Sequence, residues 1–275
     1  GLYAGEELTA KDSKIIPADG LVEIISVDEN GKAKAKSDLP FGNYYLKEIS
    51  TDQHYSLSDE KFSVPFEYAG QTVDIVDIKA SDGKSISNEL IYGEVHGMKK
   101  DENGKALGGA AIGLFYTDGK EPVLTTVSAE DGSFSFKDIP FGEYIVREIK
   151  APEGFVMDET PYAVNIDKDG AVVEIEITNK LIRGNVQLTK VDVNYPDHHL
   201  SGAEFEVYQN GKLVGKMEEL ADGVYKMDNL PYGEYSLKET KAPEGFYLDE
   251  GTYAFSIKEN GKTVIVENEA GKGFI

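Results

Sequence analysis

Apolar and polar residues alternate with a period of two along much of the chain. β-Branched and aromatic residues dominate the alternating segments, and Asn-Gly or Asp-Gly pairs typical of tight turns separate them. No segment has the spacing of an amphipathic helix. Short strands separated by a turn about every 8–12 residues predict small antiparallel β-sandwiches, and therefore an all-β chain. The clearest alternating segments are residues 134–136, 144–148, 162–166 and 172–179.

One part of the pattern occurs three times. Residues 38–49, 138–149 and 229–240 share Pro-(Phe/Tyr)-Gly followed by a Tyr and then a Glu, and the last two copies continue with Lys-Ala-Pro-Glu-Gly-Phe. The copies are spaced by about 90 to 100 residues, which is the length of a domain and not of a solenoid repeat. No Pro-, Ser- or Gly-rich linker separates them, which indicates close coupling. We expect three tandem modules: module one at 1–92, module two at 93–182 and module three at 183–275.

The composition excludes several partners and several kinds of chemistry. The chain has 50 Asp and Glu against 28 Lys and Arg, and its formal net charge of −22 opposes nucleic acid and anionic membranes. No apolar run reaches the ~20 residues of a membrane span, and the first residues do not resemble a signal peptide. The chain has no Cys, so disulfides, thiolate metal sites and thiol nucleophiles are excluded. We expect no nucleic-acid partner, no membrane insertion and no cofactor.

Motifs that suggest metal binding or catalysis are weak. Residues 28–31 and 101–104 resemble calcium loops, but a Lys follows each and the EF-hand Glu is missing, so we interpret them as hairpin turns. His198 and His199 are adjacent, and adjacent strand residues point to opposite faces, so we interpret them as part of a solvated loop. No Ser, His and Asp stand in the local context of a hydrolase. We expect no metal site and no enzyme.

A lysine, a glutamate and an asparagine occur at matching places in modules two and three. Lys99 follows Val95 and Gly97 at every second position, and Asn179 ends an apolar series with the same period. A period of two places both side chains on the core face. A strand-end lysine usually reaches water, but a buried charge is costly unless it is paired or neutralised, so a triple that occurs twice indicates chemistry. The two sets are Lys99, Glu148 and Asn179, and Lys190, Glu239 and Asn268.

These motifs resemble a known family over nearly the whole chain. The motifs are the opening Lys-(Val/Lys)-Asp of modules two and three, the repeated centre from Pro-(Phe/Tyr)-Gly to Ala-Pro-Glu-Gly-Phe, and the terminal Asn. Together they are similar to the collagen-adhesin B-type (CnaB-like) domains of Gram-positive adhesins and pilins. The resemblance implies a prealbumin-like, reverse-immunoglobulin β-sandwich with an isopeptide bond between a first-strand Lys and a last-strand Asn, assisted by a Glu. The implied bonds are Lys99–Asn179 and Lys190–Asn268, with Glu148 and Glu239 as the catalytic residues.

The chemistry of such a bond follows from burial. A dry core disfavours both an ammonium and a carboxylate, so folding yields a neutral amine, which is a nucleophile, beside a neutral acid. The acid can donate to the Asn carbonyl oxygen and then carry protons as ammonia leaves. This is a single self-modification without turnover. The implied function is structural: a rigid, secreted stalk segment of a cell-surface or pilus protein, attached to the cell wall through residues outside this sequence.

Module one departs from the pattern. Alignment of Gly1 with Gly113 leaves residues 93–112, and with them the first strand and its lysine, without a counterpart. Glu48 and Asn88 occupy the Glu and Asn positions, so we expect no internal isopeptide bond there. Two explanations remain open: the sequence begins within a domain, or the gap accepts a strand from elsewhere.

A second function remains open beside the stalk. The stretch from Glu48 to Asn88 is longer than its counterparts in the other modules. Module one is therefore an alternative ligand-binding region of an adhesin. Its partner would be a host or matrix protein or glycan that the sequence does not identify.

Overall fold

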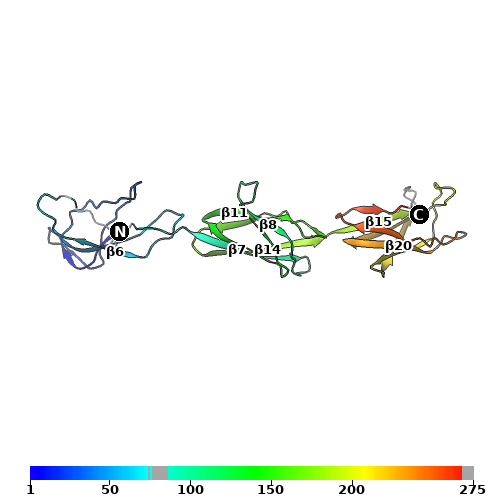
Figure 1. Cartoon of the computed structure of the whole chain (residues 1–275), viewed down its shortest axis with the longest axis horizontal. Coiled ribbons are helices and arrows are strands. Elements are labelled where there is room, and N and C mark those ends of the chain that lie inside the picture. The colour runs from blue at the N-terminus through cyan, green and yellow to red at the C-terminus, as the bar shows by residue number, and fades with distance from the viewer. Residues whose placement is uncertain (74, 76–85, 268–275) are drawn as a thin grey trace. The chain divides into compact units, whose positions relative to one another are not determined.

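Strands and turns make up all the regular structure of the computed structural model, which describes residues 1–73, 75 and 86–267 (Figure 1). These residues form no α-helix, and the predicted all-β class is confirmed. Accordingly, the described residues include no helix long and apolar enough to cross a membrane.

The chain divides into two compact units. The first consists of Gly1–Glu94, Lys137–Gly142 and Asn165–Val172, and the second contains the remaining residues from Val95 onward. The first unit thus includes strand ends that the sequence analysis assigned to module two. The boundaries of the three modules stay a prediction, and the module names are kept for the three residue ranges.

Module one contains a four-stranded antiparallel sheet in the order β4-β1-β5-β6. Its core consists of the buried side chains of Leu2, Ala4, Leu8, Tyr44 and Val64. Pro65 lies in β6, an edge strand, where the missing N–H costs no ladder hydrogen bond. The strands are β1 (Leu2–Ala4), β4 (Leu21–Glu23), β5 (Gly42–Lys47) and β6 (Lys61–Phe66), with β2 (Leu8–Thr9) and β3 (Ile15–Ile16) forming a separate pair.

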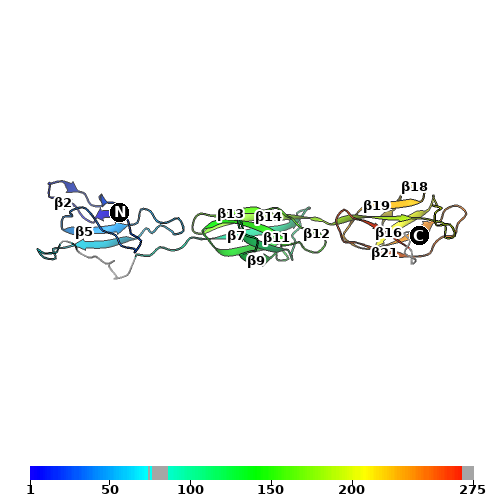
Figure 2. The same ribbon diagram turned by 90° about the horizontal axis from the view of Figure 1, so that it is seen from above.

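Module two contains two four-stranded sheets, several of whose strands Figure 2 labels. Buried apolar side chains such as Val95, Ile112, Val146 and Ile177 come from both sheets. The side chain of Ile166 in β13 lies against Gly93 in β7, where a Cβ would come within 2.7 Å of it, so the two sheets are closely packed. The first sheet has the order β10 (Ser133–Pro140), β7 (Tyr92–Asp101), β14 (Ala171–Leu181) and β12 (Phe155–Val156). The second has the order β13 (Tyr162–Ile166), β11 (Gly142–Lys150), β8 (Ala111–Tyr116) and β9 (Leu124–Val127).

Module three repeats this arrangement around a core that includes Val186, Leu188, Phe205, Tyr225 and Leu237. Its strands β15 and β22 pair in parallel, with Val186 opposite Val264. One sheet has the order β18 (Glu218–Ala221), β19 (Val224–Pro231), β15 (Arg183–Thr189) and β22 (Thr263–Ile265). The other has the order β17 (Lys212–Lys216), β16 (Glu204–Gln209), β20 (Gly233–Lys241) and β21 (Tyr253–Ile257).

Only one of these two sheets has a counterpart in the described part of module one. The order β4-β1-β5-β6 matches β9-β8-β11-β13 and β17-β16-β20-β21. In module two, β10 is hydrogen-bonded to β7 alone. No described strand of module one takes the place of β7, and residues 33–40, which align with β10, form no strand. A segment whose only ladder partner is missing gains no backbone hydrogen bonds by extending.

The repeated Pro-(Phe/Tyr)-Gly motif is a structural corner. Its glycines, Gly42, Gly142 and Gly233, have φ values of 156°, 147° and 152°, which side chains rarely adopt. A Cβ on Gly42 would come within 2.3 Å of Leu8. The tyrosine two residues later fastens the corner, because the Tyr235 hydroxyl donates to the Pro231 carbonyl oxygen at 2.7 Å. The motif therefore forms the start of the strand that carries the Glu found at the matching position of each repeat.

Candidate functional site

Three polar side chains meet in the core of module two. Lys99 lies near the end of β7, Glu148 near the end of β11 and Asn179 near the end of β14. In β14 every second residue from Ile175 to Asn179 is buried, so the strand period directs the asparagine into the core. Lys99 is 0%, Glu148 5% and Asn179 1% exposed. The sequence analysis grouped these three residues, and the structure brings them together.

The contacts join the two sheets of the sandwich, because β7 and β14 belong to one sheet and β11 to the other. Lys99 Nζ donates to Asn179 Oδ1 and lies 3.2 Å from Glu148 Oε1. Asn179 Nδ2 donates to both Glu148 oxygens at 3.0 Å. One carboxyl oxygen is therefore within reach of both nitrogen atoms. The mechanism expected from the sequence has the Glu donate to the Asn carbonyl oxygen; in this geometry that oxygen faces Lys99 and the carboxyl group faces the amide nitrogen.

Burial changes the chemistry of the lysine. Desolvation lowers the pKa of Lys99, and the negative charges of Glu148 and Asp158 act in the opposite direction. A lowered pKa makes the neutral amine, which is the nucleophilic form, accessible closer to neutral pH. The site thus combines a nucleophile, a proton carrier and an amide carbonyl within hydrogen-bonding distance of one another.

The second Glu148 oxygen is held from outside the triad. The backbone N–H of Asp158 donates to Glu148 Oε2 at 2.7 Å, and the Tyr162 hydroxyl donates to Asp158 Oδ2 at 2.7 Å. The sequence analysis missed both residues. The repeats do contain a signal for them, because Asp-Glu-x-x-Tyr follows the Ala-Pro-Glu-Gly-Phe segment at residues 158–162 and again at 249–253.

Module three has the same arrangement as far as the structure describes it. Lys190 Nζ lies 3.1 Å from Glu239 Oε1, and the two residues are 7% and 4% exposed. The backbone N–H of Asp249 donates to Glu239 Oε2 at 2.7 Å. Asn268, the third residue grouped with them, lies outside the described residues. Val266, two positions before it, is buried.

In module one the glutamate and asparagine meet without a lysine. Asn88 Nδ2 donates to Glu48 Oε2 at 2.6 Å and to the Ser56 carbonyl oxygen at 3.0 Å. The backbone N–H of Ser58 also donates to Glu48 Oε2, at 2.9 Å. Within residues 1–73, 75 and 86–267, no lysine forms an ion pair with Glu48. Two parts of the triad are therefore assembled in module one.

The weaker motifs are turns or exposed loops. Asp28 and Asp101 each accept hydrogen bonds on Oδ1 from backbone N–H groups two and four residues later, as in Asx-stabilised turns. His198 and His199 are exposed. In the part of the chain that the structure describes, no three His, Asp or Glu side chains are grouped so as to hold a metal ion.

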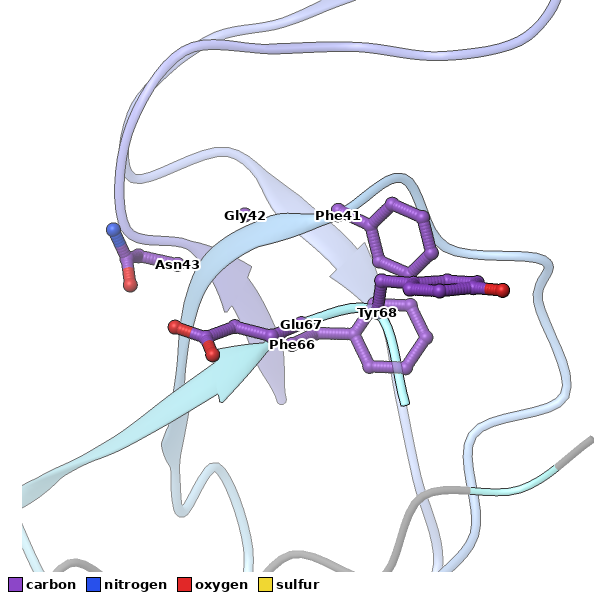
Figure 3. Close-up of a pocket in the computed structure, with 6 residues that line it drawn as sticks. All are labelled: Phe41, Gly42, Asn43, Phe66, Glu67 and Tyr68. Carbon is purple, nitrogen blue, oxygen red and sulfur yellow. The ribbon is translucent and has the colours of Figure 1, made fainter. Parts of the chain in front are cut away.

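A shallow pocket of about 410 Å³ lies on module one. Figure 3 shows the rings of Phe41, Phe66 and Tyr68 on one side and the polar ends of Asn43 and Glu67 on the other. The Phe41 ring lies 5.4 Å from that of Phe66 and 6.0 Å from that of Tyr68. Phe41 is 59% and Tyr68 63% exposed, so the pocket presents aromatic surface to solvent.

Comparison with known proteins identifies the family. The model of the SpaA prealbumin-like fold domain matches residues 4–79, 93–181 and 184–272, so the chain belongs to this family and carries three of its domains. The predicted resemblance to CnaB-like domains of Gram-positive surface proteins is confirmed.

Among solved structures, the Bacillus anthracis TIE protein is similar, with 31% identity and a TM-score of 0.71 over 87% of this chain and 44% of that one. Among curated proteins, serine-aspartate repeat-containing protein D of Staphylococcus aureus is 24% identical over 162 residues, 52% of this chain. Colossin-A of Dictyostelium discoideum is 27% identical over 149 residues, also 52% of this chain. The matched part covers 12% and 1% of the lengths of these two proteins.

Proposed function

We propose that this chain is a structural stalk segment of an extracellular surface protein, in which modules two and three are locked by isopeptide bonds that they form themselves. The bonds join Lys99 to Asn179 and Lys190 to Asn268, with Glu148 and Glu239 as proton carriers. The observation that supports this most directly is the fully buried contact among Lys99, Glu148 and Asn179. A core that only needed to be stable would carry apolar side chains there.

The reaction is an exchange of one amide nitrogen for another. The Lys99 amine attacks the side-chain carbonyl carbon of Asn179, a new C–N bond forms, and the bond from that carbon to Nδ2 breaks. The proton that Nζ loses passes through Glu148 to Nδ2, which leaves as ammonia. The distances of 3.2 and 3.0 Å from Glu148 Oε1 to the two nitrogens suit this transfer. The rigid sandwich supplies the proximity.

The parallel pairing of β15 and β22 supports the same chemistry in module three. Asn185 is opposite Thr263 and Gln187 is opposite Ile265, and Val266 N donates to the Gln187 carbonyl oxygen at 2.9 Å. The described pairing thus brings the end of β22 beside the part of β15 that comes just before Lys190. Glu239 Oε1 is buried and, apart from the ion pair with Lys190 Nζ at 3.1 Å, has no hydrogen-bond donor among the described residues, which suits an asparagine amide as a second partner.

The expected benefit is mechanical. Each bond ties the first strand of a module to its last, so tension along the chain crosses the module through a covalent link and leaves the sheet hydrogen bonds unloaded. Closing a loop of 80 residues, as the separation of Lys99 and Asn179 gives, stabilises by about 4–5 kcal/mol in the chain-entropy model for disulfides. The lysine is consumed in the process, so the chain turns over no substrate.

The extracellular location is part of the proposal. It is supported by the likeness to domains of the TIE protein and of a staphylococcal serine-aspartate repeat protein. Attachment to the cell wall or to a pilus would come from residues outside this sequence.

Intact-mass spectrometry tests the proposal. The purified chain is expected to be lighter than its sequence by two ammonia molecules. Each of Lys99→Ala, Glu148→Ala and Lys190→Ala is expected to reduce the deficit to one. A wild-type chain of full sequence mass would overturn the proposal.

Ligand recognition by module one is a second candidate function. The exposed aromatic pocket around Phe41 and Tyr68 favours it, since aromatic rings that contact one another offer rigid contact area to a host or matrix protein or glycan. Loss of capture of matrix proteins or glycans in Phe41→Ala and Tyr68→Ala, with capture retained in Phe246→Ala, would support recognition. Equal capture by all three variants would contradict it.

Strand acceptance by module one is supported by different residues. The Glu48 and Asn88 pair lacks only the amine, and the segment aligned with β10 has no ladder partner among the residues that the structure describes. A lysine-bearing strand from outside this sequence would supply both the missing amine and the missing ladder partner.

A further inference from the structure

A hydrogen-bonded network behind each reactive glutamate is the same in modules two and three. The backbone N–H of the residue ten positions after the Glu donates to Glu Oε2, and that residue is an aspartate in both modules. Four positions later a tyrosine hydroxyl donates to the same aspartate, at 2.7 Å in module two and 2.6 Å in module three. The members are Asp158 and Tyr162 in module two and Asp249 and Tyr253 in module three.

The aspartate side chain builds the turn that presents its own N–H. Asp158 Oδ1 accepts the backbone N–H of Thr160 at 3.0 Å, and Asp249 Oδ1 accepts that of Gly251 at 2.7 Å. With one oxygen used in this turn and the other bound by the tyrosine at the start of the next strand, the aspartate is held at both ends. The N–H that it presents binds Glu148 Oε2, which also accepts from Asn179 Nδ2, and leaves Oε1 as the oxygen that reaches both Lys99 Nζ and Asn179 Nδ2.

Module one provides a contrast within the same chain. Ser58 and Phe62 stand at the two matching positions. Ser58 N still donates to Glu48 Oε2 at 2.9 Å, and Ser58 Oγ accepts the backbone N–H of Glu60 at the longer distance of 3.3 Å. Phe62 has no hydroxyl to fasten the turn. The module without a reactive lysine is therefore also the module without the carboxylate and the hydroxyl.

We propose that Asp158 with Tyr162, and Asp249 with Tyr253, are positioning residues for isopeptide formation: they lock the turn whose N–H holds Glu Oε2, so that Oε1 faces the lysine and asparagine nitrogens. This inference rests on the proposed function. It assigns roles to four residues outside the two triads and explains why their spacing is repeated.

The aspartate also acts on the lysine through its charge. The charged groups that act on the Lys99 amine are Glu148 on β11 and Asp158 in the loop before β13, and both favour its protonated form. Burial by itself would raise the pKa of Asp158, but the hydrogen bonds from Thr160 and Tyr162 outweigh it and lower that pKa. Burial, followed by the bond to Asp158, raises the pKa of Tyr162 to about 12, so its hydroxyl remains a donor below that pH.

The experiment measures each bond separately during refolding of the full chain. Chain isolated from inclusion bodies in urea is diluted into buffers of different pH, quenched at intervals and digested. The cross-linked peptide pairs around Lys99 and Lys190 are then quantified by mass spectrometry. The variants are Asp158→Ala, Asp158→Asn and Tyr162→Phe, with Glu159→Gln as the control because this exposed carboxylate is adjacent to Asp158. The module-three bond serves as the internal control for folding.

Asp158→Ala and Tyr162→Phe are expected to slow the module-two bond by about tenfold or more, because small displacements of a reacting group are costly. The module-three bond should form at the wild-type rate. Asp158→Asn keeps one oxygen for the Thr160 N–H and offers an amide N–H to the Tyr162 hydroxyl oxygen, so the turn can stay fastened while the charge is lost. It should restore most of the rate and move the pH profile to lower pH, a shift that a purely structural role would not produce.

Unchanged module-two rates in Asp158→Ala and Tyr162→Phe would overturn the inference while leaving the proposed function intact. A failure of the wild-type chain to form either bond would overturn the proposed function, and this inference with it.

Discussion

Lys99 Nζ and Glu148 Oε1 lie 3.2 Å apart, and neither side chain is exposed to solvent. A permanent ion pair in such a place is hard to justify by stability, because the desolvation of two charges offsets most of their attraction. Conversion of the amine into an amide removes this cost. The lysine would carry its charge at most until the module has folded. The amide that replaces it is neutral, and a core tolerates a neutral group. This is the physical argument for proposing that the pair is the reactant state of an amide-forming reaction.

The contribution of the bond to stability can be isolated by comparing two neighbouring lysines. Lys99→Met is expected to destabilise module two by about 4–5 kcal/mol, the loop-closure value. Lys100 lies next to it, faces Glu176 on the partly exposed side and forms an ion pair there. Lys100→Met should therefore cost about 1 kcal/mol or less. Hydrogen exchange of the β7 and β14 amides in denaturant measures both effects. Equal destabilisation by the two variants would argue against a covalent link at Lys99.

The role of Glu148 as a proton carrier predicts a clear result for Glu148→Gln. Glutamine keeps the size of the side chain and one acceptor oxygen, which can still accept the Asp158 N–H, so module two should fold, but it cannot take up and return a proton. Bond formation is expected to slow by about 10²–10⁴-fold. Intact mass over time, with circular dichroism to verify folding, measures this. Glu176→Gln is the matched control on an exposed carboxylate. A normal rate in Glu148→Gln would exclude proton transfer through this residue.

The positions of Lys99 and Asn179 could be predicted because each lies in a strand, where a period of two leaves no freedom about which side chain is buried. The repeat added Glu148, since three copies of one motif aligned it. Asp158 could not be found from periodicity, because it lies in the loop between β12 and β13, where side-chain direction depends on the turn. The sequence pattern also could not predict the orientation of the Asn179 amide, that is, whether its oxygen or its nitrogen faces the Glu148 carboxyl group.

The architecture of module one shows a further limit. The sequence predicted the lack of a first strand, with its lysine. It did not predict that residues 33–40 form no strand in the described structure, although they resemble β10 in module two. Sequence pattern reports the preference of a segment, whereas a strand also requires a partner for its N–H and C=O groups. In module two that partner is β7.

The pH dependence of stability follows from the lowered pKa of Lys99, which desolvation causes against the opposing charges of Glu148 and Asp158. In Asn179→Ala, which cannot form the bond, the folded state binds this proton less tightly than the unfolded state does. The unfolded chain therefore holds more protons between the lowered pKa and about 10.4, and stability rises with pH across that window. At pH values below the lowered pKa of Lys99, the full free-energy cost of burying its protonated amine is present.

Denaturant unfolding of Asn179→Ala from neutral pH to about 10.4 measures this slope. The double variant Lys99→Met/Asn179→Ala lacks the titrating amine and serves as the control, because all other groups are unchanged. As pH rises, the free energy of unfolding of Asn179→Ala should increase relative to that of the double variant. Parallel curves would mean that burial does not weaken proton binding at Lys99.

Module one provides the last prediction, because Glu48 and Asn88 are already in contact at 2.6 Å. A synthetic peptide of residues 93–101, which carries the Lys99 strand, should form a covalent adduct with the full chain, lighter than the sum of the two by one ammonia molecule. The same peptide with Lys99→Arg, and the chain variants Asn88→Ala and Glu48→Gln, should give none. The reaction should be slow, since module one has Ser58 and Phe62 at the positioning sites. The double variant Ser58→Asp/Phe62→Tyr should accelerate it. Absence of any adduct in both chains would show that the Glu48 and Asn88 pair is a structural remnant that accepts no strand.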